Sequence, residues 1–161
     1  MPYSNTDFSV DPAQVLFGAA LELLARREHS RHELKQKLAG KFPGADFDAL
    51  FERLQTLNYQ SDQRFAEVFV RARVQRGQGP MRIRQELQQR GIRGELATHA
   101  IEQLEVDWFE LAQEQLQRKY RAPINIALPR DQQMKERARR QRYLAYRGFP
   151  ADAISWALDG K

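Results

Sequence analysis

Histidine and carboxylate side chains gather at one place where the chain could bind a metal ion: Glu28, His29, His32 and Glu33. Imidazole and carboxylate groups are zinc ligands, and two histidines three residues apart on a continuous helix can chelate one ion. The run Ser30-Arg31-His32-Glu33, however, has the form of a capping box, in which a serine and a glutamate begin a new helix. We therefore interpret this stretch as a surface turn between two helices and predict no metal site.

Other residues offer little catalytic chemistry. Asp46, Asp48 and Glu52 could suggest a carboxylate site, but the helix dipole favours acidic residues in a first turn, which is the simpler explanation. The chain has no cysteine, which excludes disulfides, thiolate zinc sites and cysteine nucleophiles. It has no phosphate-binding loop of the form G-x-x-x-x-G-K-S/T, and the isolated His99 suggests no role. We predict a protein that is not an enzyme and has no cofactor.

Basic residues carry a clearer signal. Residues 62–104 contain 8 basic and 5 acidic side chains, and residues 117–147 contain 10 and 2. Such segments attract polyanions or acidic protein surfaces, although a charge run can also be a solvated helix face. In the first segment we predict partner contacts for Arg71, Arg73, Arg76, Arg82, Arg84 and Arg90. In the second segment we predict them for Lys135, Arg137, Arg139, Arg140, Arg142 and Arg147.

Two tyrosines, Tyr143 and Tyr146, lie among the arginines of the second segment. Aromatic rings beside arginines can stack on exposed nucleobases. The neighbouring Leu144 and Phe149 are more typical of core residues, and we predict that both are buried.

The apolar pattern predicts helices along the whole chain. Asp11-Pro12 marks a helix start, because aspartate caps helices and proline suits the first helical position. Glycine and proline at Gly40 and Pro43-Gly44 separate later helices. Another helix begins near Ser61-Asp62, and its predicted inward residues are Phe65, Val68, Phe69 and Ala72. No stretch alternates with a period of two for long enough to indicate a strand, so we predict an all-α fold.

The helical pattern recurs three times. Leu34 and Leu38 match Ile83 and Leu87 after 49 residues, and the run Arg90-Gly91-Ile92 matches Arg147-Gly148-Phe149 after 57 residues. We predict three tandem tri-helical repeats of the helix-turn-helix kind, arranged as an elongated or curved chain. The predicted segments are a tail (1–11), a first repeat (12–59), a second (60–106) and a third (107–161) with a loop insertion at 121–130.

Three motifs on these repeats resemble those of RecX regulatory proteins. The first is Tyr59-Gln60-Ser61-Asp62-Gln63-Arg64-Phe65-Ala66, followed by Arg71-Ala72-Arg73. The second, Gly79-Pro80-Met81-Arg82-Ile83-Arg84-Gln85-Glu86-Leu87 with Arg90-Gly91-Ile92, is similar to the family's G-x-x-x-I-x-x-E-L-x-x-x-G-I. The third is Arg31-His32-Glu33-Leu34-Lys35-Gln36-Lys37-Leu38. The resemblance covers roughly residues 14–158, and one departure is Lys41-Phe42, where the family often has a glycine after the basic residue.

The resemblance implies a function. RecX proteins are bacterial modulators, usually inhibitors, of the RecA recombinase, and they consist of three tandem tri-helical repeats. They bind the RecA filament on single-stranded DNA, lie in its groove, and block its extension or promote its disassembly. The twelve basic residues named above would then contact RecA or DNA. We expect a cytoplasmic protein, because the chain has neither a secretory signal nor an apolar run that could span a membrane. We expect a monomer, because the sequence contains no heptad run.

Three alternatives stay open at this point. A general DNA-binding helix-turn-helix protein would show salt-dependent DNA affinity without RecA. A small metal-dependent nuclease would need clustered carboxylates, of which the chain offers only the first-turn acids. A scaffold of helical repeats could bind an acidic protein other than RecA.

Overall fold

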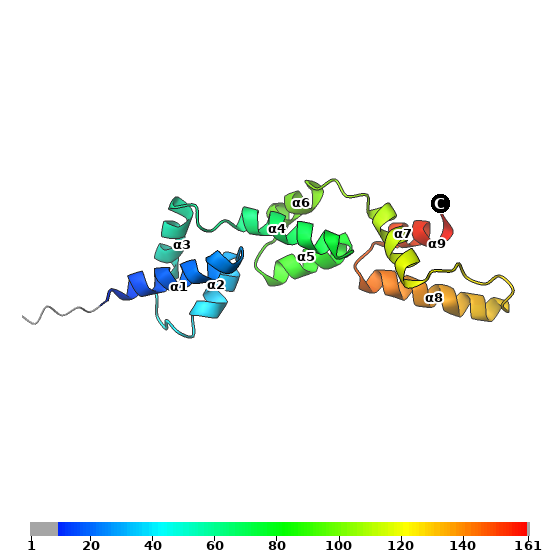
Figure 1. The fold of residues 1–161 in the computed structure, drawn as a ribbon, viewed down its shortest axis with the longest axis horizontal. Helices are drawn as coiled ribbons and strands as arrows, with labels where there is room; N and C mark the ends of the chain where they lie inside the picture. The colour runs from blue at the N-terminus through cyan, green and yellow to red at the C-terminus, as the bar shows by residue number, and fades with distance from the viewer. Residues whose placement is uncertain (1–9, 161) are drawn as a thin grey trace, which may run out of the picture. The chain divides into compact units, whose positions relative to one another are not determined.

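A computed structural model describes residues 10–160, and this part of the chain contains nine α-helices and no strand (Figure 1). The prediction of an all-α fold built from three three-helix repeats is confirmed. The helices are α1 (Pro12–Arg26), α2 (Arg31–Leu38), α3 (Phe47–Thr56), α4 (Asp62–Gln75), α5 (Pro80–Gln89), α6 (Gly94–Glu102), α7 (Trp108–Lys119), α8 (Arg130–Tyr146) and α9 (Ala151–Asp159). The described residues fold as two compact units, which divide between Phe65 and Ala66.

The predicted helix starts are confirmed by their capping bonds. The Asp11 carboxylate accepts a hydrogen bond from the amide of Ala13 at 3.0 Å, and Pro12 is the first residue of α1. Ser30 Oγ accepts from the amide of Glu33 at 3.1 Å, and the Glu33 carboxylate accepts in return from the Ser30 amide at 3.2 Å. These polar side chains therefore satisfy backbone groups at helix ends.

The first compact unit buries the apolar faces of α1, α2 and α3 against one another. Leu34, Leu54 and Ala20 are fully buried at its centre. The turn between α1 and α2 also meets the start of α4, because Asp62 Oδ1 accepts from the amide of Arg31 at 2.9 Å and Arg64 pairs with Glu28 at 2.6 Å. Asp62 and Arg64 thus bind the first turn of α4 to the turn between α1 and α2.

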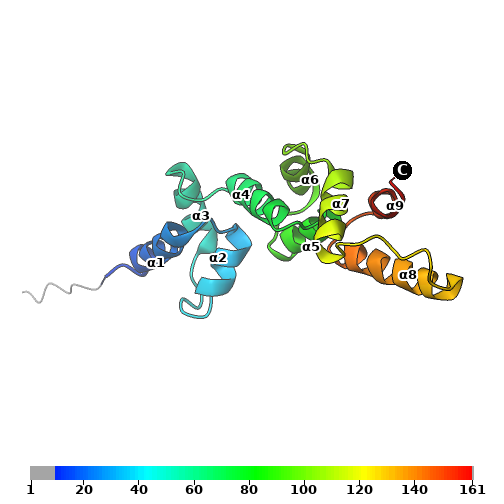
Figure 2. The same cartoon turned by 45° about the vertical axis from the view of Figure 1, so that its right-hand side comes forward.

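The second compact unit contains two small cores. The second repeat buries Val70, Ile83, Leu87 and Ile92 completely. Figure 2 shows α7, α8 and α9 together, and their shared core is Ala112, Leu116, Leu144, Phe149, Ala153, Ile154 and Ala157. The predicted burial of Leu144 and Phe149 is confirmed.

The inward face predicted for α4 is partly wrong. Val68 is 44% exposed, and Ala72 is exposed, whereas Ala66 and Val70 are fully buried. From Ala66 the inner row of α4 runs four residues to Val70 and three more to position 73. Arg73 therefore lies on the inner side of α4.

Two glycine-containing turns interlock within the second unit. The amide of Gly79 donates to the carbonyl of Arg147 at 2.7 Å, and the amide of Met81 donates to the carbonyl of Gly148 at 3.0 Å. A Cβ on Gly79 would lie 2.4 Å from the Gly148 carbonyl carbon, so neither backbone leaves room for a side chain there. We call this contact between residues 77–82 and 146–149 the glycine joint; it connects the second repeat to the third.

Gly148→Ala tests how much the glycine joint contributes to stability. Gly148 has a φ of +96°, and a Cβ there would lie 2.3 Å from Cβ of Arg82. Left-handed strain of roughly 1–2 kcal/mol and the steric overlap should together lower the unfolding free energy by at least about 2 kcal/mol, measured by urea unfolding with circular dichroism.

Gly94→Ala is the matched control, because Gly94 also has a positive φ, +60°, but has open space around its Cβ position. It should cost about 1 kcal/mol, from strain alone. Equal losses of unfolding free energy in the two variants would show that the steric overlap at Gly148 adds nothing to the cost of backbone strain.

Candidate functional site

All twelve predicted contact residues lie in the second compact unit, on α4, α5, α8 and the turns that follow them. The structure divides them by their neighbours. Six guanidinium groups are held by partners within the molecule: Arg73, Arg82, Arg90, Arg137, Arg140 and Arg147. Six basic side chains are exposed: Arg71, Arg76, Arg84, Lys135, Arg139 and Arg142.

Glu86 organises three of the held arginines. Its carboxylate pairs with Arg73 at 3.0 Å and with Arg82 at 3.6 Å, and its backbone carbonyl accepts from Arg90 at 3.0 Å. The guanidinium groups of Arg73 and Arg90 also lie 4.5 and 4.7 Å from the ring centre of Phe69. These cations hold α4 against α5, and they neutralise a carboxylate that would otherwise be poorly solvated.

Arg147 binds the end of α4 across the glycine joint. Its Nε donates to the carbonyl of Gly77 at 3.1 Å, and its Nη2 donates to the carbonyl of Arg76. Carbonyls at a helix C-terminus lack helical partners and carry partial negative charge, so a cation there is favourable. Arg147 therefore has a structural role at the joint.

Two further arginines of α8 are engaged inside the third repeat. Arg140 is buried and lies 4.6 Å from the ring centre of Tyr120. Arg137 forms a two-point ion pair with Asp159 at 2.6 and 2.9 Å, and this hydrogen bonding raises the pKa of Arg137 above its ordinary range. Both fasten α8 to its neighbours in the same repeat.

The exposed group is the set available to an outside anion. The described residues supply no ion-pair or hydrogen-bond partner for the side chains of Arg71, Arg76, Arg84, Lys135 or Arg142. Arg139 is 65% exposed and pairs with Glu136 at 3.4 Å. Arg118, Arg121 and Arg130 are exposed as well and were not among the predicted contacts, although the charge count of residues 117–147 was a signal for them.

The two tyrosines among these arginines differ. Tyr143 is half-buried and packs edge-on against Tyr120, with ring centres 5.9 Å apart. Tyr146 is 76% exposed, and the guanidinium of Arg82 lies 4.9 Å from its ring centre. Of the pair, Tyr146 is the ring that a ligand can reach.

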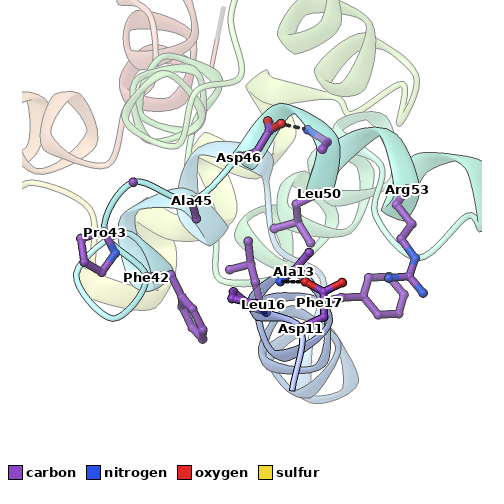
Figure 3. Close-up of a pocket in the computed structure, with 13 residues that line it drawn as sticks. Asp11, Ala13, Leu16, Phe17, Phe42, Pro43, Ala45, Asp46, Leu50 and Arg53 are labelled. Carbon is purple, nitrogen blue, oxygen red and sulfur yellow. Dashed lines mark hydrogen bonds between the residues drawn. The ribbon is translucent and has the colours of Figure 1, made fainter. Parts of the chain in front are cut away.

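A cavity of about 590 Å³ opens in the first unit between α1, α3 and the loop before α3 (Figure 3). Its charged lining residues are already engaged, since Asp11 and Asp46 cap helices. Arg53 donates to Gln14 at 3.1 Å, and its guanidinium lies 3.8 Å from the ring centre of Phe17. The charged groups of this cavity thus support the fold of the first repeat.

The residues first considered as metal ligands form the turn between α1 and α2. The predicted turn is present, but it is not wholly at the surface, because His29 and Ser30 are buried. Nδ1 of His29 lies 3.0 Å from the carbonyl of Arg27, and Nε2 lies 3.1 Å from Nζ of Lys37. Because an ammonium group can only donate, Nε2 accepts from Lys37 and Nδ1 carries the proton. In the part of the chain that is described, no three His, Asp or Glu side chains are placed to hold a metal ion.

The surroundings of this turn lower the pKa values of His29 and Glu33. Burial lowers the pKa of His29, and the nearby positive charges of Arg27 and Lys37 lower it further, against the opposing effect of the Arg27 carbonyl and Glu33. Burial raises the pKa of Glu33, but its hydrogen bonds with Arg27 and the Ser30 amide outweigh this and lower it overall. His29 is thus neutral, and Glu33 ionised, at neutral pH.

Within residues 10–160, no helix is long and apolar enough to cross a membrane.

Each of the three repeats matches a known protein-family model. Family models for the first, second and third three-helix domains of RecX match residues 17–54, 61–101 and 105–158. "Regulatory protein RecX" of Halorhodospira halophila is 46% identical over 138 residues, which cover 84% of this chain and 81% of the relative. The protein of the same name from Chromohalobacter salexigens is 42% identical over 140 residues, or 86% of this chain and 88% of the relative. The chain belongs to the RecX family.

Solved RecX structures share the fold. RecX from Lactobacillus salivarius aligns with a TM-score of 0.74 over 94% of this chain and 99% of its own, at 23% identity. A second crystal structure of regulatory protein RecX aligns with a TM-score of 0.75 over 92% of this chain and 74% of its own, at 24% identity. The RecX-like motifs contain Arg64 and Glu86, and in this chain both residues form ion pairs within the molecule.

Arg147→Ala separates a structural arginine from an exposed one. The variant loses two charge-assisted hydrogen bonds to the carbonyls of Arg76 and Gly77, and the unfolding free energy should fall by about 2 kcal/mol. Arg142→Ala on the same α8 helix should change it by less than about 0.5 kcal/mol, because Arg142 is exposed. Urea unfolding of both variants measures the difference; similar small changes would contradict the role of Arg147.

Stability should depend on the protonation of His29. Folding lowers its pKa below the ordinary value of 6.5, so the unfolded chain binds this proton more readily. The contribution of His29 is therefore complete above pH 6.5 and is lost as the pH falls from there towards the folded-state pKa. We expect the unfolding free energy to decrease as the pH falls below 6.5.

His29→Gln should flatten this decrease, because glutamine keeps a donor and an acceptor but takes up no proton. His32→Gln is the control, since His32 is exposed and should leave the pH profile unchanged. An unaltered profile in His29→Gln would assign the pH dependence to another group.

Proposed function

We propose that this chain is a regulator that binds RecA filaments on single-stranded DNA and mainly inhibits the recombinase, ATPase and coprotease activities of RecA. It acts by binding rather than catalysis, in the cytoplasm, as a monomer. The observation that carries the proposal is the set of exposed basic side chains on α4, α5 and α8, in a chain whose relatives are named regulatory proteins.

The chemistry of these side chains supports a nucleoprotein target. Exposed cations attract phosphates without reading sequence, as a regulator of filaments formed on any DNA requires. Tandem repeats can contact successive positions along a filament, so that modest individual contacts combine into a high overall affinity. Acidic surfaces of the recombinase could bind the same cations.

The first test measures ATP hydrolysis by RecA on single-stranded DNA while this protein is added below the RecA concentration. Inhibition that increases with each substoichiometric addition supports the proposal. Absence of inhibition together with ordinary salt-dependent DNA binding would instead support a general DNA-binding protein.

A charge-matched pair of variants then tests the exposed surface. Lys135→Ala/Arg142→Ala removes two exposed cations seven residues apart on one face of α8. It should weaken inhibition and reduce the slope of log affinity against log salt by about 1.4, because each phosphate contact to single-stranded DNA contributes about 0.7.

Arg26→Ala/Lys41→Ala removes the same charge from exposed positions of the first repeat and is the control. It should retain the wild-type slope. A similar reduction in both double variants would mean that net charge matters and that the surface of α8 does not.

A further inference from the structure

An open groove of about 520 Å³ lies beside the glycine joint, between α5 and the end of α8. Two large apolar side chains line it and remain mostly exposed: Met81 at 61% and Tyr146 at 76%. The joint holds the backbone of both residues, since the Met81 amide donates to the Gly148 carbonyl and the Tyr146 carbonyl accepts from Arg82 at 3.4 Å. Exposed apolar side chains that gather on an ordered backbone indicate a binding surface.

The shape and chemistry of the groove suit a flat aromatic ligand. Tyr146 offers a ring, and Arg82 lies over it at 4.9 Å, which orients the ring and leaves much of it exposed. Met81 adds a polarisable thioether that packs well against aromatic groups. Gln85 and Gln89 also line the groove, and their amides can both donate to and accept from the edge of any nucleobase.

Charge around the groove favours a nucleic acid over an uncharged peptide. Glu86 is the acidic residue in the lining, and its carboxylate is neutralised by Arg73 and Arg82. Arg142 lies one turn before Tyr146 on the same face of α8, is exposed, and could reach the phosphate next to a bound base.

We propose that this groove binds one unpaired nucleobase of single-stranded DNA, with Tyr146 as the stacking surface and Arg142 as the contact for the adjacent phosphate. The inference rests on the DNA-binding part of the proposed function and does not require RecA. Because α5 belongs to the second repeat and α8 to the third, the bound base also bridges the two repeats at their joint.

Fluorescence anisotropy with a labelled oligothymidylate, in the absence of RecA, tests the stacking role. Tyr146→Ala should weaken binding by about tenfold, since base–aromatic stacking typically contributes that much per base. Tyr146→Phe keeps the ring and should bind like the wild type. Met134→Ala removes another exposed apolar side chain of α8, 63% exposed, and should have no effect.

The salt dependence separates stacking from charge. Tyr146→Ala should keep the wild-type slope of log affinity against log salt, whereas Arg142→Ala should reduce it by about 0.7. A thermal melt by circular dichroism confirms that each variant is folded. Unchanged affinity in Tyr146→Ala, or equal losses in Tyr146→Phe and Tyr146→Ala, would overturn the proposal, as would a wild type that does not bind the oligonucleotide.

Photocrosslinking gives a direct second readout. An oligonucleotide that carries 5-iodouracil should crosslink to the peptide that contains Tyr146, and a duplex of the same sequence should not. Crosslinks confined to other peptides would overturn the proposal.

Measuring RecA inhibition by the Tyr146→Ala variant tests the nucleobase site and the proposed RecA function separately. Intact oligonucleotide binding with weakened RecA inhibition would mean that the groove accepts a protein side chain, and would overturn the nucleobase site alone. Tyr146-dependent DNA binding by a chain that never inhibits RecA would support the nucleobase site and overturn the proposed function.

Discussion

The contact between two backbones at Gly79 and Gly148 determines how the second compact unit is organised. The two backbone segments approach so closely here that a Cβ on either glycine would overlap the other segment. The same approach brings Arg147 to the carbonyls that end α4 and brings Arg82 to the ring of Tyr146. At the joint, the side chains of Arg82 and Arg147 therefore serve the fold.

Local features of the sequence were sufficient to predict the helices and their repetition. Capping by Asp11, Ser30 and Asp46 involves residues two or three positions apart, so the signal is contained in a short stretch of chain. The repetition depends on matched apolar spacing, such as Leu34 with Leu38 and Ile83 with Leu87, and all four residues are buried. Regular spacing of apolar residues is the strongest sequence signal of secondary structure, so the buried faces of the helices could be predicted.

The roles of the basic residues depended on contacts that no local pattern contains. Arg73 pairs with Glu86, 13 positions later, and Arg147 binds a carbonyl 70 positions earlier. The inner face of α4 was misjudged for a related reason, because Val68 looked like a core residue although Ala66 and Val70 fill the core. Twelve arginines and lysines that look alike in the sequence therefore divide into structural and exposed groups only once the repeats are packed.

The bonds that join Gly79 and Met81 to Arg147 and Gly148 are made by backbone atoms alone. Such a connection requires the two glycines and is strengthened by the Arg147 side chain, and it depends little on the other side chains around it. Surfaces of the third repeat can consequently diversify, and the loop between α7 and α8 can change in length, without altering how this repeat attaches to the second. The joint thus fixes the attachment of the third repeat to the second independently of most of the surface that either repeat exposes.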